Sequence, residues 1–176
     1  MKNIATTICL LLLSTASQAV SLGMATKNTN LFYGGGLGLS LGNDYSYIEL
    51  SPMLGIHLTP KISSGVSLMY RHTSDKRNSI DRSADDYGAT LFGRYRLSSQ
   101  IFLEGDLEHL NYERFFTDGS SERTNFDSVL AGGGFSSAVG SNASFTISML
   151  YNFSYNEADS PYTDPLIVRA GFGVGF

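Results

Sequence analysis

Apolar residues recur at every second position along most of this chain. The clearest run covers residues 143–155, where apolar residues alternate with serine, threonine and asparagine and only Leu150 breaks the alternation. A second run covers residues 166–176, where Arg169 and three glycines separate the apolar residues. Because successive side chains of a strand point to opposite faces, each run predicts a β-strand with one apolar and one polar face.

The same alternation recurs upstream and brings the number of predicted strands to eight. It predicts strands at residues 48–58, 62–71, 87–97 and 101–108, with a further strand at 31–41 and a less regular one near 126–135. An even number of strands of about ten residues each is typical of bacterial outer-membrane barrels.

The predicted connections alternate between short and long. Short turns fall at residues 59–61, 98–99 and 138–142, and long polar loops at 73–85, 114–125 and 156–165. The connection at residues 42–44 falls on the same side as the long loops but is brief. Short turns of such barrels face the periplasm and long loops face outside, so both termini are expected on the periplasmic side.

Alternation alone also fits a soluble β-sandwich. Three features favour a membrane barrel: charges in the middle of the polar faces, aromatic residues such as Tyr70, Tyr87, Tyr95 and Tyr155 near strand ends, and the final Phe176. Interfacial aromatic girdles are a property of membrane barrels. The sequence therefore predicts an all-β fold, an eight-stranded antiparallel transmembrane β-barrel.

The polar faces are expected to place a charge network in the lumen. Its predicted members are Glu49, Arg71, Arg94, Arg96, Glu104, Asp106, Glu108 and Arg169. If residues 98–99 lie in a three-residue turn, Arg94 faces Glu104 directly and Arg96 lies diagonal to it. An eight-stranded barrel has a lumen that side chains fill. We expect a structural salt-bridge core, with a proton path, a solute site or a narrow channel as alternatives.

Two sets of glycines are expected to meet where the barrel closes. Gly34, Gly36 and Gly38 share one face of the first strand, and Gly171, Gly173 and Gly175 share one face of the last. They predict a smooth inner wall that leaves room for the long charged side chains opposite.

The N-terminal residues are typical of a secretory signal peptide. Lys2 precedes an apolar core at residues 8–13, and Ser17-Gln18-Ala19 fits a small-residue cleavage site. We therefore expect a signal peptide at 1–19 and the barrel at 20–176. The only cysteine, Cys9, lies inside the signal core, so the mature part offers no disulfide or thiolate site.

Charge and hydropathy fit this interpretation. The chain carries 12 basic and 16 acidic residues, and residues 1–19 hold one base and no acid, so the mature part has a net charge of −5. Such acidity argues against nucleic acid as a partner. The mean hydropathy is −0.03, as expected when apolar residues alternate with polar ones instead of forming long runs.

The chain resembles small outer-membrane β-barrel proteins of the OmpA/OmpX class. The resemblance rests on YGGGLGLSLG (33–42), FGRYRLSSQIFLEGDLEHLNYE (92–113) and PYTDPLIVRAGFGVGF (161–176). The ending resembles the signal read by the barrel assembly machinery, through Arg169, Gly171, Val174 and Phe176, although Val174 stands where an aromatic is usual. The resemblance implies architecture, insertion by that machinery and location in the cell outer membrane, and it implies no activity.

One group of residues suggests catalysis. His72 and Ser74 form a His-x-Ser motif similar to that of outer-membrane lipid A deacylases, which would make His72 the base, Ser74 the nucleophile and Asp86 the orienting acid. The motif lies far from the C-terminus where that family carries it, Asp75 replaces the usual asparagine, and Asp86 faces the lumen by parity. Asp85 faces outward but stands one residue off the spacing.

The favoured function is a non-catalytic membrane scaffold or surface-interaction protein that acts through its extracellular loops. Its expected partners are outer-membrane lipids and lipopolysaccharide, the assembly machinery during insertion and an unidentified envelope protein. No cofactor and no metal are expected, because no ligand spacing appears. A lipid A ester hydrolase and a narrow channel are the alternatives.

Overall fold

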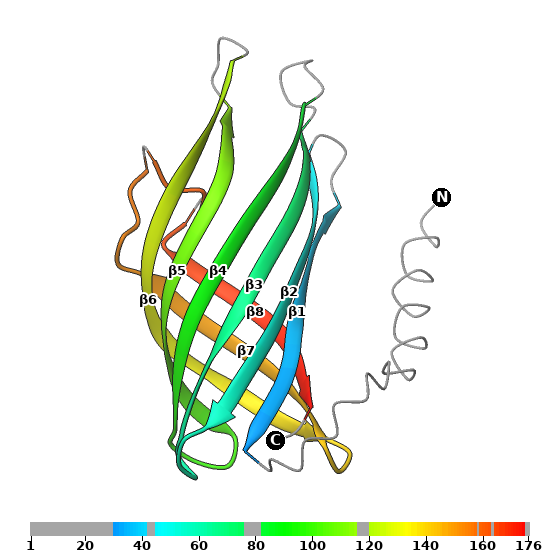
Figure 1. Cartoon of the computed structure of the whole chain (residues 1–176), viewed down its shortest axis with the longest axis vertical. Helices are drawn as coiled ribbons and strands as arrows, with labels where there is room; N and C mark the ends of the chain where they lie inside the picture. The colour runs from blue at the N-terminus through cyan, green and yellow to red at the C-terminus, as the bar shows by residue number, and fades with distance from the viewer. Residues whose placement is uncertain are drawn as a thin grey trace.

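The chain folds into a closed antiparallel β-barrel of eight strands in sequence order (Figure 1). The computed structural model describes residues 30–41, 45–75, 82–115, 120–157, 159–162 and 164–174. The predicted signal peptide and Phe176 lie outside the described residues. The strands are β1 (Leu31–Leu41), β2 (Tyr45–His57), β3 (Ile62–Asp75), β4 (Arg82–Arg96), β5 (Ile101–Phe115), β6 (Ser121–Val139), β7 (Ala143–Asn152) and β8 (Leu166–Val174). The predicted fold class is confirmed.

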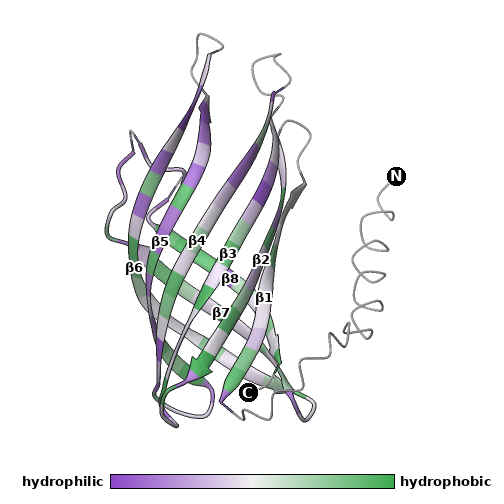
Figure 2. Ribbon diagram, in the orientation of Figure 1, coloured by the Kyte–Doolittle hydropathy of each residue, from purple (hydrophilic) through white to green (hydrophobic). Residues whose placement is uncertain are grey.

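The outer wall of the barrel is apolar. Large hydrophobic side chains lie exposed around all eight strands, among them Leu37, Leu68 and Val168, each more than 60% exposed. Figure 2 shows that hydrophobic residues predominate along the lower part of the strands, while the upper ends of β3 to β6 are largely hydrophilic. A continuous apolar surface of this size requires a nonaqueous environment or a partner. Within the described residues, no helix is long and apolar enough to cross a membrane.

Three short turns close one end of the barrel, which we call the short-turn end. Two of them use the same device: Thr59 Oγ1 accepts a hydrogen bond from the Ile62 amide at 2.9 Å, and Ser98 Oγ accepts one from the Ile101 amide at 3.0 Å. The third turn contains Gly140 at a φ of 75°, a conformation that glycine adopts without steric cost. The predicted short turns are confirmed.

A layer of aromatic side chains fills the lumen near the short-turn end. Phe32, Phe92 and Phe102 are at most 6% exposed, and the Phe32 and Phe92 rings lie 6.3 Å apart. Glycines on neighbouring strands make room for these rings: a Cβ added at Gly55 would lie 2.2 Å from Phe32 Cζ, and one at Gly134 would lie 2.4 Å from Phe102 Cζ. The inner face here is a packed aromatic core.

Two predicted loops are largely strand, which corrects their boundaries. β3 continues to Asp75 and β4 begins at Arg82, within the predicted loop 73–85. β5 continues to Phe115 and β6 begins at Ser121, within the predicted loop 114–125. The alternation persists in the upper parts of these strands, where polar residues face outward. On β5, Leu110 and Tyr112 are buried inside. Above the apolar belt the outer residues of these strands are polar, so the strand ends resemble loops in the sequence.

The third predicted loop is real, and it begins earlier than expected. β7 ends at Asn152, and the chain turns where the Ser154 amide donates to Asn152 Oδ1 at 2.9 Å. Tyr155, expected at a strand end, therefore lies in the loop. We call residues 153–165 the β7–β8 loop.

Candidate functional site

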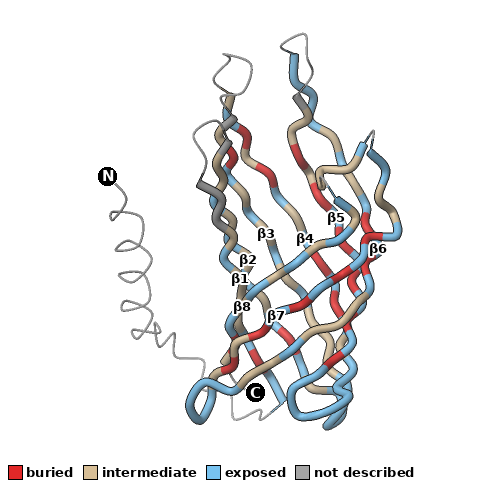
Figure 3. The backbone as a smooth tube through the Cα atoms, turned by 180° about the vertical axis from the view of Figure 1, so that it is seen from behind, coloured by how far each residue is buried: buried red, intermediate tan, exposed pale blue. Residues whose placement is uncertain are grey.

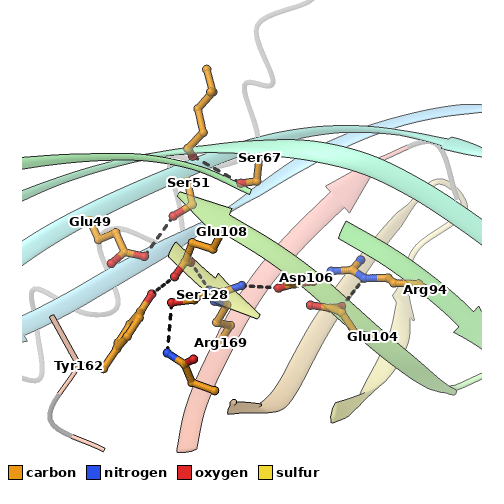
Figure 4. Close-up of polar contacts among 12 residues, drawn as sticks. Glu49, Ser51, Ser67, Arg94, Glu104, Asp106, Glu108, Ser128, Tyr162 and Arg169 are labelled. Carbon is orange, nitrogen blue, oxygen red and sulfur yellow. Dashed lines mark hydrogen bonds and ion pairs between the residues drawn. The ribbon is translucent and has the colours of Figure 1, made fainter. Parts of the chain in front are cut away.

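The lumen contains three ion-pair clusters, each of which joins two strands, and Figure 4 shows those of Arg94 and Arg169. Arg94 and Glu104 are register partners on β4 and β5, and Arg94 Nε lies 2.5 Å from Glu104 Oε2. The Arg94 guanidinium also lies 4.9 Å and 5.0 Å from the centres of the Phe92 and Phe102 rings. Arginine is thus held by both a carboxylate and aromatic faces, which suits a poorly hydrated cation.

A second cluster lies on β2 and β3. Glu49 and Arg71 are register partners, and Arg71 donates to Glu49 Oε2 from Nε at 3.0 Å and from Nη2 at 2.8 Å. Ser51 Oγ donates to the other Glu49 oxygen at 3.1 Å. Both carboxylate oxygens of Glu49 therefore have partners.

The third cluster crosses the lumen from β8 to β5. Arg169 Nη1 lies 2.7 Å from Asp106 Oδ2, and Arg169 Nη2 lies 2.6 Å from Glu108 Oε2. The two carboxylates are 3% and 6% exposed. One arginine thus neutralises part of the charge of two buried carboxylates and fixes β8 against the opposite wall.

Arg96, the remaining predicted member of the charge network, is placed elsewhere. It pairs in register with Phe102 and lies exposed at the short-turn end. Arg96 and Glu104, both of which lie among the described residues, form no ion pair, because Glu104 pairs with Arg94. Arg96 lies diagonal to Glu104 as expected, but the Glu104 carboxylate is already paired with Arg94.

The β7–β8 loop folds into the mouth of the barrel. Tyr162 Oη donates to Glu108 Oε1 at 2.6 Å, so the loop contacts the Arg169 cluster from above. Tyr112 Oη donates to the Asp159 carbonyl at 2.5 Å, and Arg114 pairs with the Asp159 carboxylate at 2.9 Å. Burial, followed by the charge of Glu108, raises the pKa of the Tyr162 phenol, which keeps it a hydrogen-bond donor. Sequence analysis missed Tyr162, because nothing in a loop sequence indicates which strand the loop will contact.

A cavity of about 670 Å³ lies among these clusters, above the aromatic layer. Its lining includes Glu49, Arg71, Asp106, Arg169 and Tyr162. The Oδ1 atom of Asp106 is buried without a hydrogen-bond partner among the described residues. This cavity is of the size that small ligands occupy.

A polar network covers the outer face of the upper strands. We call residues 72–75, 82–85, 109–115 and 121–127 the sheet extension, since they lie beyond the apolar belt. Two cross-strand His–Asp pairs begin it: His72 Nδ1 lies 2.7 Å from Asp85 Oδ1, and His109 Nδ1 lies 2.6 Å from Asp127 Oδ1. Asn111 bonds Asn125 at 2.8 Å, and Arg123 bonds Asn111 at 2.8 Å. Tyr70 and Tyr87, paired just below, mark the upper edge of the belt.

The predicted catalytic group is not assembled. His72 faces outward and pairs with Asp85, which also accepts a hydrogen bond from Tyr70 Oη at 2.8 Å. Asp86 faces the lumen, is 8% exposed and accepts from the Glu113 amide at 3.0 Å. No hydrogen bond joins Ser74 to His72, although both side chains are described. The assignment of Asp86 as orienting acid is wrong, because adjacent strand residues point to opposite faces; parity alone could have indicated Asp85.

The residues of the predicted assembly signal lie on β8. Arg169 and Gly171 face the lumen, Val174 pairs with Tyr33 and Ala143, and Phe176 lies outside the described residues. The predicted meeting of glycines is partly visible: Gly34 pairs with Gly173 and Gly36 with Gly171, whereas Gly38 lies beyond the β1–β8 pairing and Gly175 is not described. In the described residues, no three His, Cys, Asp or Glu side chains are grouped so that they could hold a metal ion.

Comparisons with known proteins identify the fold. No protein-family model matches the chain, and no curated protein matches its sequence. Among solved structures, the N-terminal β-barrel domain of Pseudomonas aeruginosa OprF matches with 14% identity and a TM-score of 0.48, over 82% of this chain and 96% of that chain. The Yersinia pestis outer membrane protein Ail, solved in a phospholipid bilayer nanodisc, matches with 16% identity and a TM-score of 0.51, over 82% of this chain and 97% of that chain. The chain has the fold of the small eight-stranded outer-membrane barrels.

Proposed function

We propose that the chain is an outer-membrane scaffold without catalytic activity that contacts lipopolysaccharide and partner molecules through the sheet extension. The observation that carries this proposal is the sharp change on the outer wall, from an apolar belt to the polar network that begins at His72, Asp85, His109 and Asp127. The belt matches the hydrocarbon of a membrane, and the network above it matches a headgroup layer.

Arg123 is the residue of the sheet extension best placed to meet lipid phosphate. Its guanidinium lies 6.0 Å from the centre of the Tyr87 ring, at the edge of the belt, and its side chain is 40% exposed. It donates to the Asp85 carbonyl at 2.9 Å and lies 3.5 Å from Glu113. The two hydrogen bonds that fix Arg123 go to neutral acceptors, the Asp85 carbonyl and Asn111 Oδ1, and Glu113 is farther away, so the guanidinium is suited to bind a phosphate in the headgroup layer.

The test compares unfolding temperatures in vesicles with and without lipopolysaccharide. We expect lipopolysaccharide to raise the unfolding temperature of the wild-type chain, and Arg123→Gln to remove most of that increase. Arg96→Gln is the matched control, since Arg96 is also an exposed arginine but lies at the opposite end. An equal loss in both variants, or no effect of lipopolysaccharide, would contradict the proposal.

The absence of catalysis is tested separately by mass spectrometry of lipid A. We expect lipid A from cells that make the wild-type chain to keep all its acyl chains, because Ser74 is not hydrogen-bonded to His72, which pairs with Asp85 instead. Loss of one acyl chain, abolished by Ser74→Ala, would establish the hydrolase alternative instead. Lipid A extracted from cells that make Ser74→Ala is the control.

A further inference from the structure

The seam between the first and last strands is closed over only part of its length. β1 pairs with β8 along Tyr33–Gly36 and Gly171–Val174. Leu37–Leu41 and Leu166–Ala170 are also strand, and they pair with β2 and β7 on their other sides, but not with each other. Figure 3 shows β1 and β8 diverging above their short paired region. By contrast, β7 pairs with β8 along the whole of that strand.

The lumen cavity extends to this open part of the seam. Its lining includes Leu37 and Gly38 of β1 and Leu166, Val168 and Arg169 of β8, together with the charged clusters. Leu37, Leu166 and Val168 face outward and are 50–70% exposed, whereas Arg169 faces inward. The lining thus includes residues of the outer wall at the part of the seam where β1 and β8 are not paired, so we infer that the cavity opens there toward the surroundings of the barrel.

An open seam in hydrocarbon leaves backbone N–H and C=O groups without partners, which is costly unless something polar satisfies them. A molecule with a polar head and a hydrocarbon chain meets both requirements. The head would lie in the cavity beside the seam, and the chain would pass between Leu37 and Val168 into the outer leaflet.

The charges of the cavity indicate which head it accepts. Its lining carries more carboxylates than guanidinium groups: Glu49, Glu104, Asp106, Glu108 and Asp164 against Arg71, Arg94 and Arg169. Each of the three arginines is already paired with a carboxylate. Asp106 is 3% exposed, and its Oδ1 lacks a described partner. The lining as a whole therefore has an excess of carboxylates, and Asp106 Oδ1 is an acceptor without a described partner, which favours an ammonium head over a phosphate.

We propose that the open part of the β1–β8 seam is a lateral portal, through which the lumen takes up an amphiphile with a primary ammonium head that donates to Asp106. This site is separate from the sheet extension, and it stands or falls independently of the function proposed above. Pairing of the two free strand edges with a second copy of the chain is the competing use of the same feature.

The first experiment tests the portal by cysteine pairing in vesicles. Continuing the register places Leu37 opposite Ala170 on the outer face, two positions above Gly35 and Phe172. We expect Leu37→Cys/Ala170→Cys to form little intramolecular disulfide under oxidation, whereas the control Tyr33→Cys/Val174→Cys forms it readily, because those residues are paired. Equally rapid disulfide formation in both would overturn the portal, as would a disulfide-linked dimer with Leu37→Cys alone, which indicates the second copy.

The second experiment tests the ligand class with dodecylamine as the probe. In bicelles, we expect dodecylamine to bind the folded chain and dodecyl phosphate to bind at least tenfold more weakly. Asp106→Asn should weaken dodecylamine binding about tenfold, and Asp127→Asn, which changes an exposed carboxylate of the outer wall, should leave it unchanged. Equal binding of the two amphiphiles, or equal effects of the two substitutions, would overturn the proposal.

A labelling experiment guards against the possibility that Asp106→Asn disturbs folding. Dodecylamine with a photoreactive diazirine near its head is applied to the wild-type chain. We expect it to label the segments around Leu37 and Val168. Labelling confined to the closed wall around Leu91 and Leu107 would contradict a lateral portal.

Discussion

At the residue scale, the interior is organised by pairing each guanidinium with a carboxylate. Arg71, Arg94 and Arg169 each meet a partner on another strand, at 2.5–2.8 Å. A charge held in poor contact with water is tolerated when it is paired and hydrogen-bonded. Removing one member should therefore cost more than removing both.

The Arg94–Glu104 pair allows this to be measured. Arg94→Met leaves Glu104, 5% exposed, without its counter-ion, so we expect a loss of about 3–5 kcal/mol in the free energy of unfolding. The double variant Arg94→Met/Glu104→Met should lose less. Urea unfolding in phospholipid vesicles, followed by the change in gel migration, gives both values.

The control for this prediction is an exposed pair. His109→Ala should cost less than about 1 kcal/mol, because His109 and Asp127 are 60% and 83% exposed. If the double variant proves as unstable as Arg94→Met alone, the stabilising role of the pairing is refuted.

Glycine makes room for the aromatic layer, and this also yields a prediction. Gly55→Ala would bring a Cβ to 2.2 Å from Phe32 Cζ, so we expect a loss of about 1–3 kcal/mol in the same unfolding assay. Gly93→Ala is the matched control, since the nearest atom to its Cβ is 4.0 Å away. Phe32→Leu should restore part of the loss in the Gly55→Ala background. Equal stability of the two alanine variants would count against this packing.

At the level of the strands, β3 to β6 extend beyond the apolar belt on one side of the barrel. The β5–β6 pairing runs from Ile101 and Phe135 up to Phe115 and Ser121. The β6–β7 pairing is shorter, because on β6 it covers only Leu130–Val139. The β7–β8 loop leans on the inner side of this taller sheet through Tyr112 and Arg114. The loop therefore acts as part of the barrel mouth and is not a free surface segment.

The Tyr162 contact predicts how firmly the loop is held. Tyr162→Phe removes the donor to Glu108 and should loosen the β7–β8 loop by about 1–2 kcal/mol, which quickens amide exchange of that loop about tenfold. Hydrogen exchange followed by mass spectrometry measures this. Tyr151→Phe, at an exposed tyrosine of β7, is the control. Unchanged exchange in Tyr162→Phe would mean that the loop is held by Tyr112 and Arg114 instead.

At the scale of the whole molecule, the stability of the barrel depends on hydrocarbon around its belt. Leu91 lies in the middle of the belt on β4, between Tyr87 and Tyr95, and is 51% exposed. Leu91→Arg should cost about 2–4 kcal/mol in vesicles, and Ser83→Arg, on the same face of the same strand but in the sheet extension, about 0–1 kcal/mol. Equal costs measured by urea unfolding would show that the belt does not face lipid.

Much of the architecture could be predicted because it depends on local alternation. The period of two fixed which residues face outward, and the short turn at residues 98–99 fixed the register that places Arg94 opposite Glu104. The ends of β3 to β6 could not be predicted in this way. Their outer residues change from apolar to polar at the headgroup level, and polarity alone does not distinguish a solvated strand from a loop.

The number of strands and the residues on their outer and inner faces, charged ones included, could therefore be predicted from the chain, because they follow from the local alternation of apolar and polar residues. The contact of Tyr162 with Glu108 and the closing of the β1–β8 seam over four residues of each strand could be found only in the folded barrel. These contacts depend on the loop path and the strand divergence that arise when the sheet closes on itself. No local pattern encodes them.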